Sequence, residues 1–209
     1  MSKITYAVTV CDELEELVRL INFLQRKMDE GDEILVQYDS DRATEGVIDY
    51  LKVISGLHQN IKVVSYPLAG NFAEFKNNLK RHSNGEFIFQ IDADELLDEY
   101  LIENLHRFLD MNKDVDLYFV PRVNTVEGLT DGHIKKWGWR VNEEGWVNWP
   151  DYQTRIYRKT SEIEWEGKVH ERIKGYNTFS VLPAEKEYAL YHPKGIERQE
   201  RQNELYEKL

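Results

Sequence analysis

The chain has 209 residues, with 27 Lys and Arg against 38 Asp and Glu, and therefore a formal net charge of −11 at pH 7. Hydrophobic residues make up 41% and charged residues 31%, which is ordinary for a globular protein and excludes a disordered chain. The acidic balance argues against a protein that coats nucleic acid or an anionic membrane through a dense cationic face. It leaves room for a bound metal cation.

The single cysteine, Cys11, cannot form an intrachain disulfide. This fits a reducing compartment, so we expect a cytoplasmic protein. The N-terminal sequence has no long apolar stretch followed by a small-residue cleavage site, and no apolar run approaches the roughly 20 residues that a membrane span needs. We therefore expect no signal peptide and no transmembrane segment, although the chain could be one domain of a longer protein.

The first 121 residues alternate between strand and helix patterns. Apolar side chains recur at every second position in 3–10, which predicts a strand. Asp12, with Glu15 as its capping-box partner, is expected to begin the following helix, and Gly31 to end it. Further along, the patterns mark strand 33–38, helix 47–54 ended by Gly56, strand 61–66, helix 72–79 capped by Asn71 and Glu74, strand 86–91, helix 97–108 and strand 115–120.

Four strand–helix units in series predict an α/β fold with a mostly parallel sheet and helices on both faces. Ligands of such sheets bind beyond the carboxyl ends of the strands. One rim should therefore gather residues 9–12, 39–41, 67–71 and 92–95.

Residues 122–209 show only short strand patterns, at 152–158, 169–173, 179–182 and 188–191, and then a polar helix from about Gly195. This part is too short and too poor in periodic apolar segments to be a separate domain. We expect it to form a small mixed β extension of the same sheet, within one domain spanning 1–209.

Two carboxylates, Asp92 and Asp94, follow the buried strand 86–91. In extended backbone their spacing of two places both side chains on one side. Hard divalent cations bind such carboxylates together with phosphate oxygens and water. The alternative is a solvated acidic turn before a helix. The position after a central strand favours the metal site.

The segment from Asn71 to Glu95 resembles the core of family 2 glycosyltransferases of the GT-A fold. That family commonly shows an Arg-Asn pair on a helix, a Gly-Asp turn, a hydrophobic strand and then Asp-Ala-Asp. Here Lys76-Asn77 stands at the Arg-Asn position, and Asp92-Ala93-Asp94 follows the hydrophobic strand.

Four further segments resemble the same family in the same order. Residues 8–13 are similar to its first strand, and residues 36–41 to its second, although the glycine usual in that second segment is absent. Arg155–Arg158, followed by residues 165–171, resembles a subgroup ending in Val-His-Glu. Tyr191-His192 resembles the C-terminal histidine of the family. The ordered set covers nearly the whole chain.

The resemblance implies transfer of a sugar from a UDP-sugar donor to a hydroxyl of a glycan or glycolipid acceptor. Bound Mn²⁺ or Mg²⁺ would offset the charge of the departing diphosphate. Residues 1–121 would bind the donor, and 122–209 would hold the acceptor and the catalytic group. Asp94 would contact the metal, and Asp92 would hold the ribose or a metal-bound water. His192 would be a further ligand, favouring Mn²⁺; an ordinary strand-end histidine is an equally open interpretation.

The resemblance also implies a nucleoside site. Asp39 would accept a hydrogen bond from the uracil ring, and Thr9 and Cys11 would line the base pocket, with plain core packing as the alternative. Lys76 would approach the base or the diphosphate, unless it is only a surface lysine. The remaining residues assigned to the donor are Asp12, Ala93 and Arg155.

Glu171 follows His170 where the family carries its catalytic acid, and it would take the proton of the acceptor hydroxyl. Asp151 is the second candidate base. One base and one metal at the leaving group imply a single displacement with inversion. A zinc-protease H-E-x-x-H motif is excluded, because position 174 is lysine.

Tryptophans crowd the segment from Trp137 to Trp149. Aromatic faces stack on sugar rings, but most tryptophans support loops from the inside. We expect most of these tryptophans to be buried and to support the loop. Trp139, together with Trp165 and His170, is expected to contact the acceptor.

Competing functions remain. A sugar-phosphate nucleotidyltransferase would share the sheet but needs a glycine-rich basic loop after its first strand, where this chain has Asp12-Glu13. A non-catalytic carbohydrate-binding or assembly module could keep the same fold. Neither a P-loop nor a dinucleotide-binding G-x-G-x-x-G motif occurs. The sequence names neither the sugar nor the acceptor.

Overall fold

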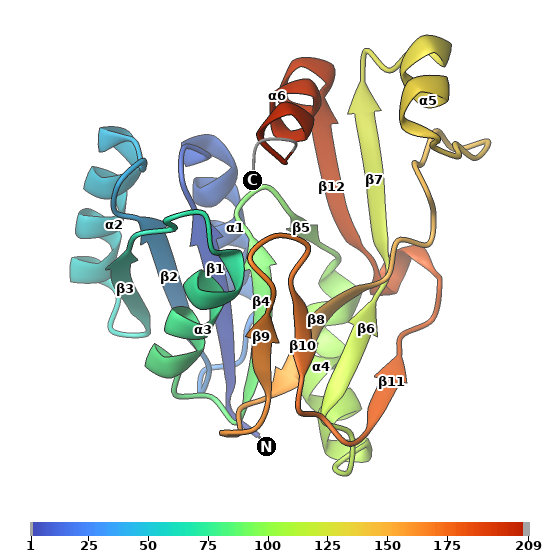
Figure 1. Ribbon diagram of the computed structural model, residues 1–209. Coiled ribbons are helices and arrows are strands. Elements are labelled where there is room, and N and C mark those ends of the chain that lie inside the picture. The colour runs from blue at the N-terminus through green and yellow to red at the C-terminus, as the bar shows by residue number, and fades with distance from the viewer. Residues whose placement is uncertain (1, 207–209) are drawn as a thin grey trace.

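The computed structural model describes residues 2–206. Its centre is a seven-stranded sheet in the order β11-β6-β8-β4-β1-β2-β3 (Figure 1). The strands are β1 (Ile4–Val10), β2 (Glu33–Asp39), β3 (Ile61–Tyr66), β4 (Phe87–Asp92), β6 (Leu117–Val120), β8 (Gln153–Arg158) and β11 (Phe179–Val181). The helices are α1 (Leu14–Lys27), α2 (Glu45–Leu57), α3 (Phe72–His82), α4 (Glu99–Met111), α5 (Asp131–Trp137) and α6 (Ile196–Tyr206), with a 3₁₀ turn, η1 (Lys186–Tyr188).

The sheet is mostly parallel, as the sequence predicts. Strands β3, β2, β1 and β4 all run in one direction, and β11 runs parallel to β6. Strand β8 is antiparallel to both of its neighbours, β4 and β6. The β-α repeats of the first half therefore build the parallel part, and a strand from the second half joins it to β6.

Both faces of the sheet are covered. Helices α1, α2 and α4 pack on one face through the buried side chains of β1 that point toward them, Ile4, Tyr6 and Val8. Ala7 points to the opposite face, where α3 and the hairpin of β9 (Glu164–Glu166) and β10 (Arg172–Lys174) lie. Successive side chains of β1 thus point alternately into two hydrophobic cores, one on each face of the sheet, as the alternation in residues 3–10 predicts.

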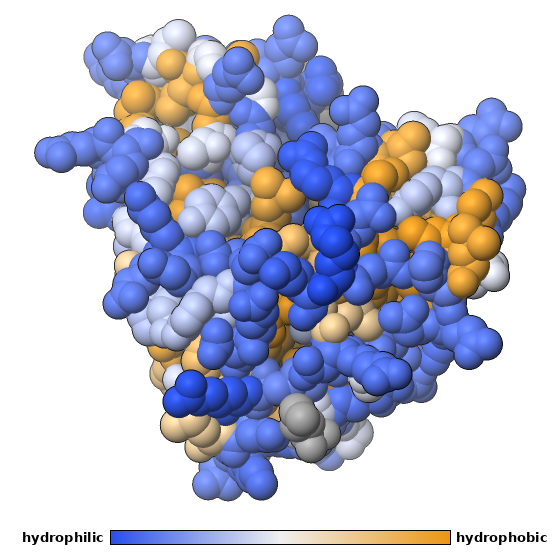
Figure 2. Space-filling model, turned by 180° about the vertical axis from the view of Figure 1, so that it is seen from behind, coloured by the Kyte–Doolittle hydropathy of each residue, from blue (hydrophilic) through white to orange (hydrophobic). Residues whose placement is uncertain are grey.

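The face of the molecule behind the sheet is mostly polar (Figure 2). Figure 2 shows the side of the molecule behind the sheet of Figure 1, where hydrophilic residues cover most of the surface and apolar areas are separate. Among residues 2–206, no helix is both long enough and apolar enough to cross a lipid bilayer.

Residues 122–209 do not simply extend the main sheet, so that expectation is wrong in part. Only β8 and β11 join it, while β5 (Leu96–Leu97), β12 (Leu190–Gly195) and β7 (Arg122–Glu127) form a separate sheet, with β12 in the middle. Pro121 separates β6 from β7, and proline has no N–H to donate to a strand neighbour. The chain leaves the main sheet at this point and runs toward β12 (Figure 1).

Several predicted boundaries are also wrong. Glu13, not Asp12, precedes α1, and its carboxylate turns back to accept hydrogen bonds from the Cys11 and Asp12 N–H groups. Helix α1 ends at Lys27, well before Gly31, and Gly56 lies inside α2.

Leu97 belongs to β5 rather than to a helix, and α4 begins at Glu99 after its N-cap Asp98. Residues 167–171 form a turn, so that β10 is only Arg172–Lys174. Strands β7 and β9 and helix α5 had no counterpart in the predicted elements. The Asn71 cap is confirmed, because its side chain accepts from the Glu74 N–H.

Asn77 ties the β9 hairpin to α3. Its side-chain N–H donates to the Trp165 carbonyl at 2.8 Å, and its side-chain oxygen accepts from the Trp165 N–H at 2.9 Å. The buried amide therefore substitutes for a neighbouring strand and satisfies both backbone groups of that residue.

Glu33 closes the opposite end of the sheet. Its carboxylate accepts hydrogen bonds from the Thr5 hydroxyl at 2.7 Å, from the backbone and side chain of Asn84, and from Lys62 at 3.0 Å. Gly85 completes this corner, because a Cβ there would lie 2.5 Å from the Thr5 nitrogen. Burial raises the pKa of Glu33, but these donors outweigh it and lower that pKa to about 2.

We expect Glu33→Gln to destabilise the protein most at neutral pH. The folded pKa lies below the ordinary value, so the carboxylate stabilises the fold fully above about pH 5 and ceases to do so as the pH falls toward 2. The pKa difference corresponds to about 3 kcal/mol of unfolding free energy. Urea denaturation at several pH values measures it, with the exposed Glu30→Gln as the charge control. A difference between wild type and variant that stays constant from pH 6 to pH 2 would contradict this assignment.

Candidate active site

A cavity of about 880 Å³ lies beyond the carboxyl ends of β1, β2 and β4. All four segments predicted to share one rim contribute to its lining, through Thr9, Asp39, Leu68 and Asp92 among others. The convergence predicted from the β-α repeats is therefore confirmed.

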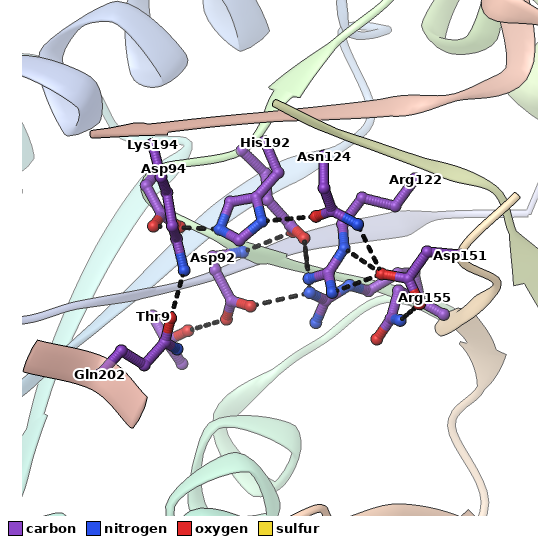
Figure 3. Close-up of polar contacts among 12 residues, drawn as sticks. Thr9, Asp92, Asp94, Arg122, Asn124, Asp151, Arg155, His192, Lys194 and Gln202 are labelled. Carbon is purple, nitrogen blue, oxygen red and sulfur yellow. Dashed lines mark hydrogen bonds and ion pairs between the residues drawn. The ribbon is translucent and has the colours of Figure 1, made fainter. Parts of the chain in front are cut away.

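Asp92 is held from two sides at the end of β4 (Figure 3). One carboxylate oxygen accepts from the Thr9 hydroxyl at 2.8 Å, and the other from Arg155 at 2.8 Å. Burial raises the pKa of Asp92, but the charges of Arg155 and Lys76 and the Thr9 hydrogen bond hold it well below the usual range. The carboxylate is ionised and its orientation is fixed.

Arg155 also binds Glu95, whose side chain is fully buried, at 2.6 Å. Burial lowers the pKa of Arg155, but the two carboxylates more than compensate and raise it. Glu95 in turn accepts from the Asp92 N–H and from Arg122. The Arg155 guanidinium is a buried counter-ion beneath the Asp-Ala-Asp segment and also lines the cavity, so its predicted contact with the donor stays a prediction. Ala93 is buried and lines the cavity as well.

The short sheet brings Asp94 and His192 together. Strand β5 begins two residues after Asp94 and pairs with β12 at Tyr191↔Leu96, which places His192 beside the acidic segment. The Nε2 atom of His192 lies 3.3 Å from an Asp94 oxygen, and the two side chains are only 11% and 12% exposed. Burial raises the pKa of Asp94, but the contact with His192 outweighs that effect and lowers it.

Asp151 lies on the other side of the same cavity and its oxygens are occupied. Oδ2 accepts from two nitrogens of Arg122, at 2.7 and 3.0 Å, and from Asn124 at 2.8 Å, while Oδ1 accepts from Gln153. Burial raises the pKa of Asp151, but Arg122 and the hydrogen bonds lower it further than burial raises it.

Glu171 faces the cavity from the turn between β9 and β10. Its carboxylate lies 2.6 Å from the Lys76 ammonium, and the Lys76 nitrogen also sits 4.5 Å from the centre of the Trp165 ring. The turn is tied to α3 by a second contact, since the Phe72 N–H donates to the Lys168 carbonyl. Helix α3 and the hairpin therefore position this carboxylate together.

The nucleoside residues proposed from the sequence lie at the cavity, with different surroundings. Asp39 is buried, and its Oδ1 accepts from the Asp41 and Leu68 N–H groups. Burial, with the nearby carboxylates of Glu13 and Asp12, raises the pKa of the Cys11 thiol to about 11. Asp12 lies at the rim and is partly exposed. Cys11 is thus a protonated, weakly polar wall of the cavity.

The three residues expected at the acceptor also line the cavity. Trp139 is half-buried and packs against Trp137, whereas His170 is exposed. Trp165 is only 5% exposed, and its indole N–H donates to the Tyr157 hydroxyl. The structure therefore gives Trp165 a packing role beneath Lys76.

Sequence reasoning identified His192 on β12 but missed the other polar residues that β7, β12 and α6 bring to the cavity, Arg122, Asn124, Lys194 and Arg198. Arg198 on α6 pairs with Glu13 and lies 3.5 Å from Asp94, and the Lys194 ammonium donates to Gln202. A strand pattern for β7 is present in the sequence, because polar Arg122 and Asn124 alternate with Val123, which is buried. No comparable local pattern marks Arg198.

The cavity concentrates basic groups within an acidic chain. Its lining includes as many basic as acidic side chains: Arg42, Lys76, Arg122, Arg155, Lys194, Arg198 and Arg201 against Asp12, Glu13, Asp39, Asp92, Asp94, Asp151 and Glu171. The whole chain has a net charge of −11. This edge of the molecule therefore lacks the excess of negative charge that the chain as a whole carries, and it repels an anionic ligand less.

Asp94 and His192 could ligate a divalent cation, since a carboxylate oxygen and an imidazole nitrogen are both ligands of Mn²⁺. Within the described part of the chain, no group of three His, Cys, Asp or Glu side chains is arranged to hold a metal ion. The protein would thus supply two ligands at this point. Two ligands from the protein are usual at sites where substrate phosphates and water complete the coordination of the metal.

Comparison with solved structures shows a shared fold. A crystal structure of S. aureus TarS 1–349 matches with a TM-score of 0.63 and 18% identity, covering 92% of this chain and 60% of that chain. The structure of TarS 1–349 in complex with UDP-GlcNAc matches with a TM-score of 0.63 and 18% identity, over 93% and 59%. The mannosyltransferase PcManGT from Pyrobaculum calidifontis, in complex with GDP-Man and Mn²⁺, gives a TM-score of 0.50 and 18% identity over 58% and 36%.

These likenesses confirm the expected GT-A architecture. The chain spans about three fifths of the length of the TarS 1–349 structures. No curated protein sequence matches it significantly. The sequence profile of the family described as glycosyl transferase family 2 matches residues 5–186, which is most of the chain. The protein belongs to glycosyl transferase family 2.

Proposed function

We propose that the protein transfers a sugar from a UDP-sugar to a hydroxyl of a glycan or of a lipid- or protein-linked glycan, with a divalent metal and with inversion. The observation that carries this proposal is the meeting of Asp94, His192 and Glu171 around one cavity at the strand ends. The complex of TarS with UDP-GlcNAc supports a uridine nucleotide as the donor carrier.

The diphosphate of the donor would lie where cations and the Asp94–His192 pair meet. Lys194 and Arg198 approach this point from β12 and α6, and Arg198 is already within 3.5 Å of Asp94. Positive groups fixed at a site of developing negative charge stabilise the transition state without reorganising. Both side chains come from the second half of the chain, so the two halves share the leaving-group site.

Asp94 and His192 are the residues that would hold the metal ion. When bound there, Mn²⁺ or Mg²⁺ would act as a Lewis acid on the diphosphate oxygens. Asp92, with its oxygens turned to Thr9 and Arg155, is better placed to fix the end of β4 and to accept from a ribose hydroxyl than to bind the metal directly.

Glu171 is the residue that we propose as the base. Its carboxylate faces the cavity and has Lys76 as its partner. Removing the proton of the acceptor hydroxyl requires a free lone pair within hydrogen-bond reach. Asp151 is less suited to this role, because its oxygens already accept four hydrogen bonds and its lowered pKa makes it a weaker base.

A non-catalytic carbohydrate-binding module is the main alternative function. It would bind sugar without metal and release no nucleotide. A sugar-phosphate nucleotidyltransferase is disfavoured by the family match. Incubating the protein with a panel of nucleotide sugars, with and without Mn²⁺, and measuring released nucleotide tests the proposal; release in the presence of EDTA alone would contradict metal dependence.

We expect Asp94→Asn to abolish the Mn²⁺-dependent binding of UDP without unfolding the protein, because the ionised oxygen facing His192 is lost. Calorimetric titration of UDP with and without Mn²⁺ measures the effect, and circular dichroism checks the fold. Asp49→Asn on the exposed side of α2 is the matched control. Unchanged Mn²⁺-dependent affinity in the Asp94 variant would remove this residue from the metal site.

Replacing Glu171 by Gln should lower turnover by roughly 10²–10⁴-fold while leaving donor binding in place, because the amide keeps the shape but cannot accept the proton. Steady-state rates and UDP affinity are to be measured together. Glu166→Gln, at an exposed position of β9 on the same hairpin, controls for loss of one charge. Wild-type rates in Glu171→Gln would transfer the role of base to another residue.

A further inference from the structure

The turn that carries Glu171 has little regular structure of its own. It joins β9 and β10, which are strands of three residues each, and two of its residues have positive φ, Gly167 at 96° and His170 at 55°. A backbone hydrogen bond from the Phe72 N–H to the Lys168 carbonyl, at 2.9 Å, ties the turn to α3. This backbone contact alone does not set the direction of a glutamate side chain, which is long and flexible.

Lys76 makes the second contact between α3 and the turn. Its ammonium nitrogen lies 2.6 Å from Oε1 of Glu171, and the two side chains are only 8% and 15% exposed. An ion pair so shielded from solvent is screened little by dissolved salt. Among residues 2–206, no other group donates to this carboxylate, so Oε2 has no protein partner. One oxygen is therefore anchored, and the other is available to a substrate.

Lys76 is itself held by its surroundings. Its ammonium lies 4.5 Å from the centre of the Trp165 ring, where a cation is attracted to the ring face. Trp165 is in turn fixed to α3 through both hydrogen bonds of Asn77, and its indole N–H donates to the Tyr157 hydroxyl. The lysine is thus positioned before any substrate arrives, and it can determine where the Glu171 carboxylate lies.

We propose that Lys76 is a positioning residue that anchors Oε1 of Glu171, so that Oε2 is presented to the acceptor hydroxyl. This inference rests on the proposed function, because it takes Glu171 as the base. An ammonium beside a carboxylate also favours its charged form and so makes it a weaker base. Orientation and basicity therefore affect the rate in opposite directions, and the sign of the change on removing Lys76 shows which effect is larger.

The other role open to Lys76 is contact with the diphosphate of the donor, since its side chain lines the cavity. The two roles affect different quantities. Loss of a diphosphate ligand would weaken UDP binding, whereas loss of a positioning residue lowers kcat and leaves UDP binding unchanged. A residue that acts through Glu171 should also have little further effect once the Glu171 carboxylate is gone, because effects on a shared partner are not additive.

The test is a double-mutant cycle of Lys76→Met and Glu171→Gln, with turnover measured as nucleotide released from the most active nucleotide sugar. Methionine keeps an unbranched chain against the Trp165 ring but has no charge. We expect Lys76→Met to lower kcat by about 10²-fold with unchanged calorimetric affinity for UDP, because small displacements of a reacting group have effects of this size. In the Glu171→Gln protein, the same substitution should change kcat little.

Lys80→Met is the matched control. Lys80 is another buried lysine of α3, and it donates to the Ile163 carbonyl before β9 without contacting Glu171. Any effect of this substitution on kcat should be the same with Glu171 and with Gln at position 171. An unchanged or raised kcat in Lys76→Met would overturn the inference. An equal loss of kcat in the two backgrounds would overturn it as well, because Lys76 would then act independently of Glu171.

Crystal structures of wild type and Lys76→Met without ligand test the anchoring apart from turnover. We expect one ordered orientation of the Glu171 side chain in wild type and its loss in the variant. A Glu171 carboxylate that keeps its wild-type position in Lys76→Met would contradict the positioning role. If the structures behave as expected but wild type releases no nucleotide from any donor, the anchoring of Glu171 by Lys76 is supported and the proposed function fails instead.

Discussion

The pairing of β12 between β5 and β7 is the constraint on which the site depends. It sets Tyr191 opposite Leu96 on one side and His192 opposite Asn124 on the other. Because side chains alternate between the two faces of a strand, a shift of one residue in this register would turn His192 away from both Asp94 and Asn124. Three segments far apart in the chain thus meet through a sheet of only three strands.

Beneath this sheet, a buried ionic cluster fixes the acidic segment. Arg155 is enclosed with Asp92 and Glu95, and Arg122 links Glu95 to Asp151. Charges of this kind are costly to bury and are tolerated only when each is paired and hydrogen-bonded. The cluster therefore ties the tip of β4, the start of β7 and strand β8 into one rigid support for Asp94.

Much of this arrangement could be predicted from the sequence, because local patterns carried it. The β-α repeats indicated where the strand ends meet, and the Asp92–Asp94 spacing and Glu171 drew attention to groups that do line the cavity. The register between distant strands leaves no local trace, so Asn124 beside His192 and Arg198 beside Asp94 could not be predicted from the sequence. The sequence also could not show which of two neighbouring acidic residues precedes α1. That residue is Glu13 rather than Asp12, and the longer Glu13 side chain reaches back to the Cys11 N–H.

The distribution of charge in the cavity has a consequence for encounter kinetics. A molecule whose overall charge is strongly negative repels an anion at long range, yet β12 and α6 bring three of the cavity's basic groups, Lys194, Arg198 and Arg201, to one side of it. Basic groups at one edge of an acidic molecule attract an anionic ligand at short range, and dissolved salt screens that attraction over about 10 Å at 0.1 M ionic strength. Under the proposed function, capture of a nucleotide would accordingly be sensitive to salt and would depend on where the cations of the cavity lie rather than on the total charge of the protein.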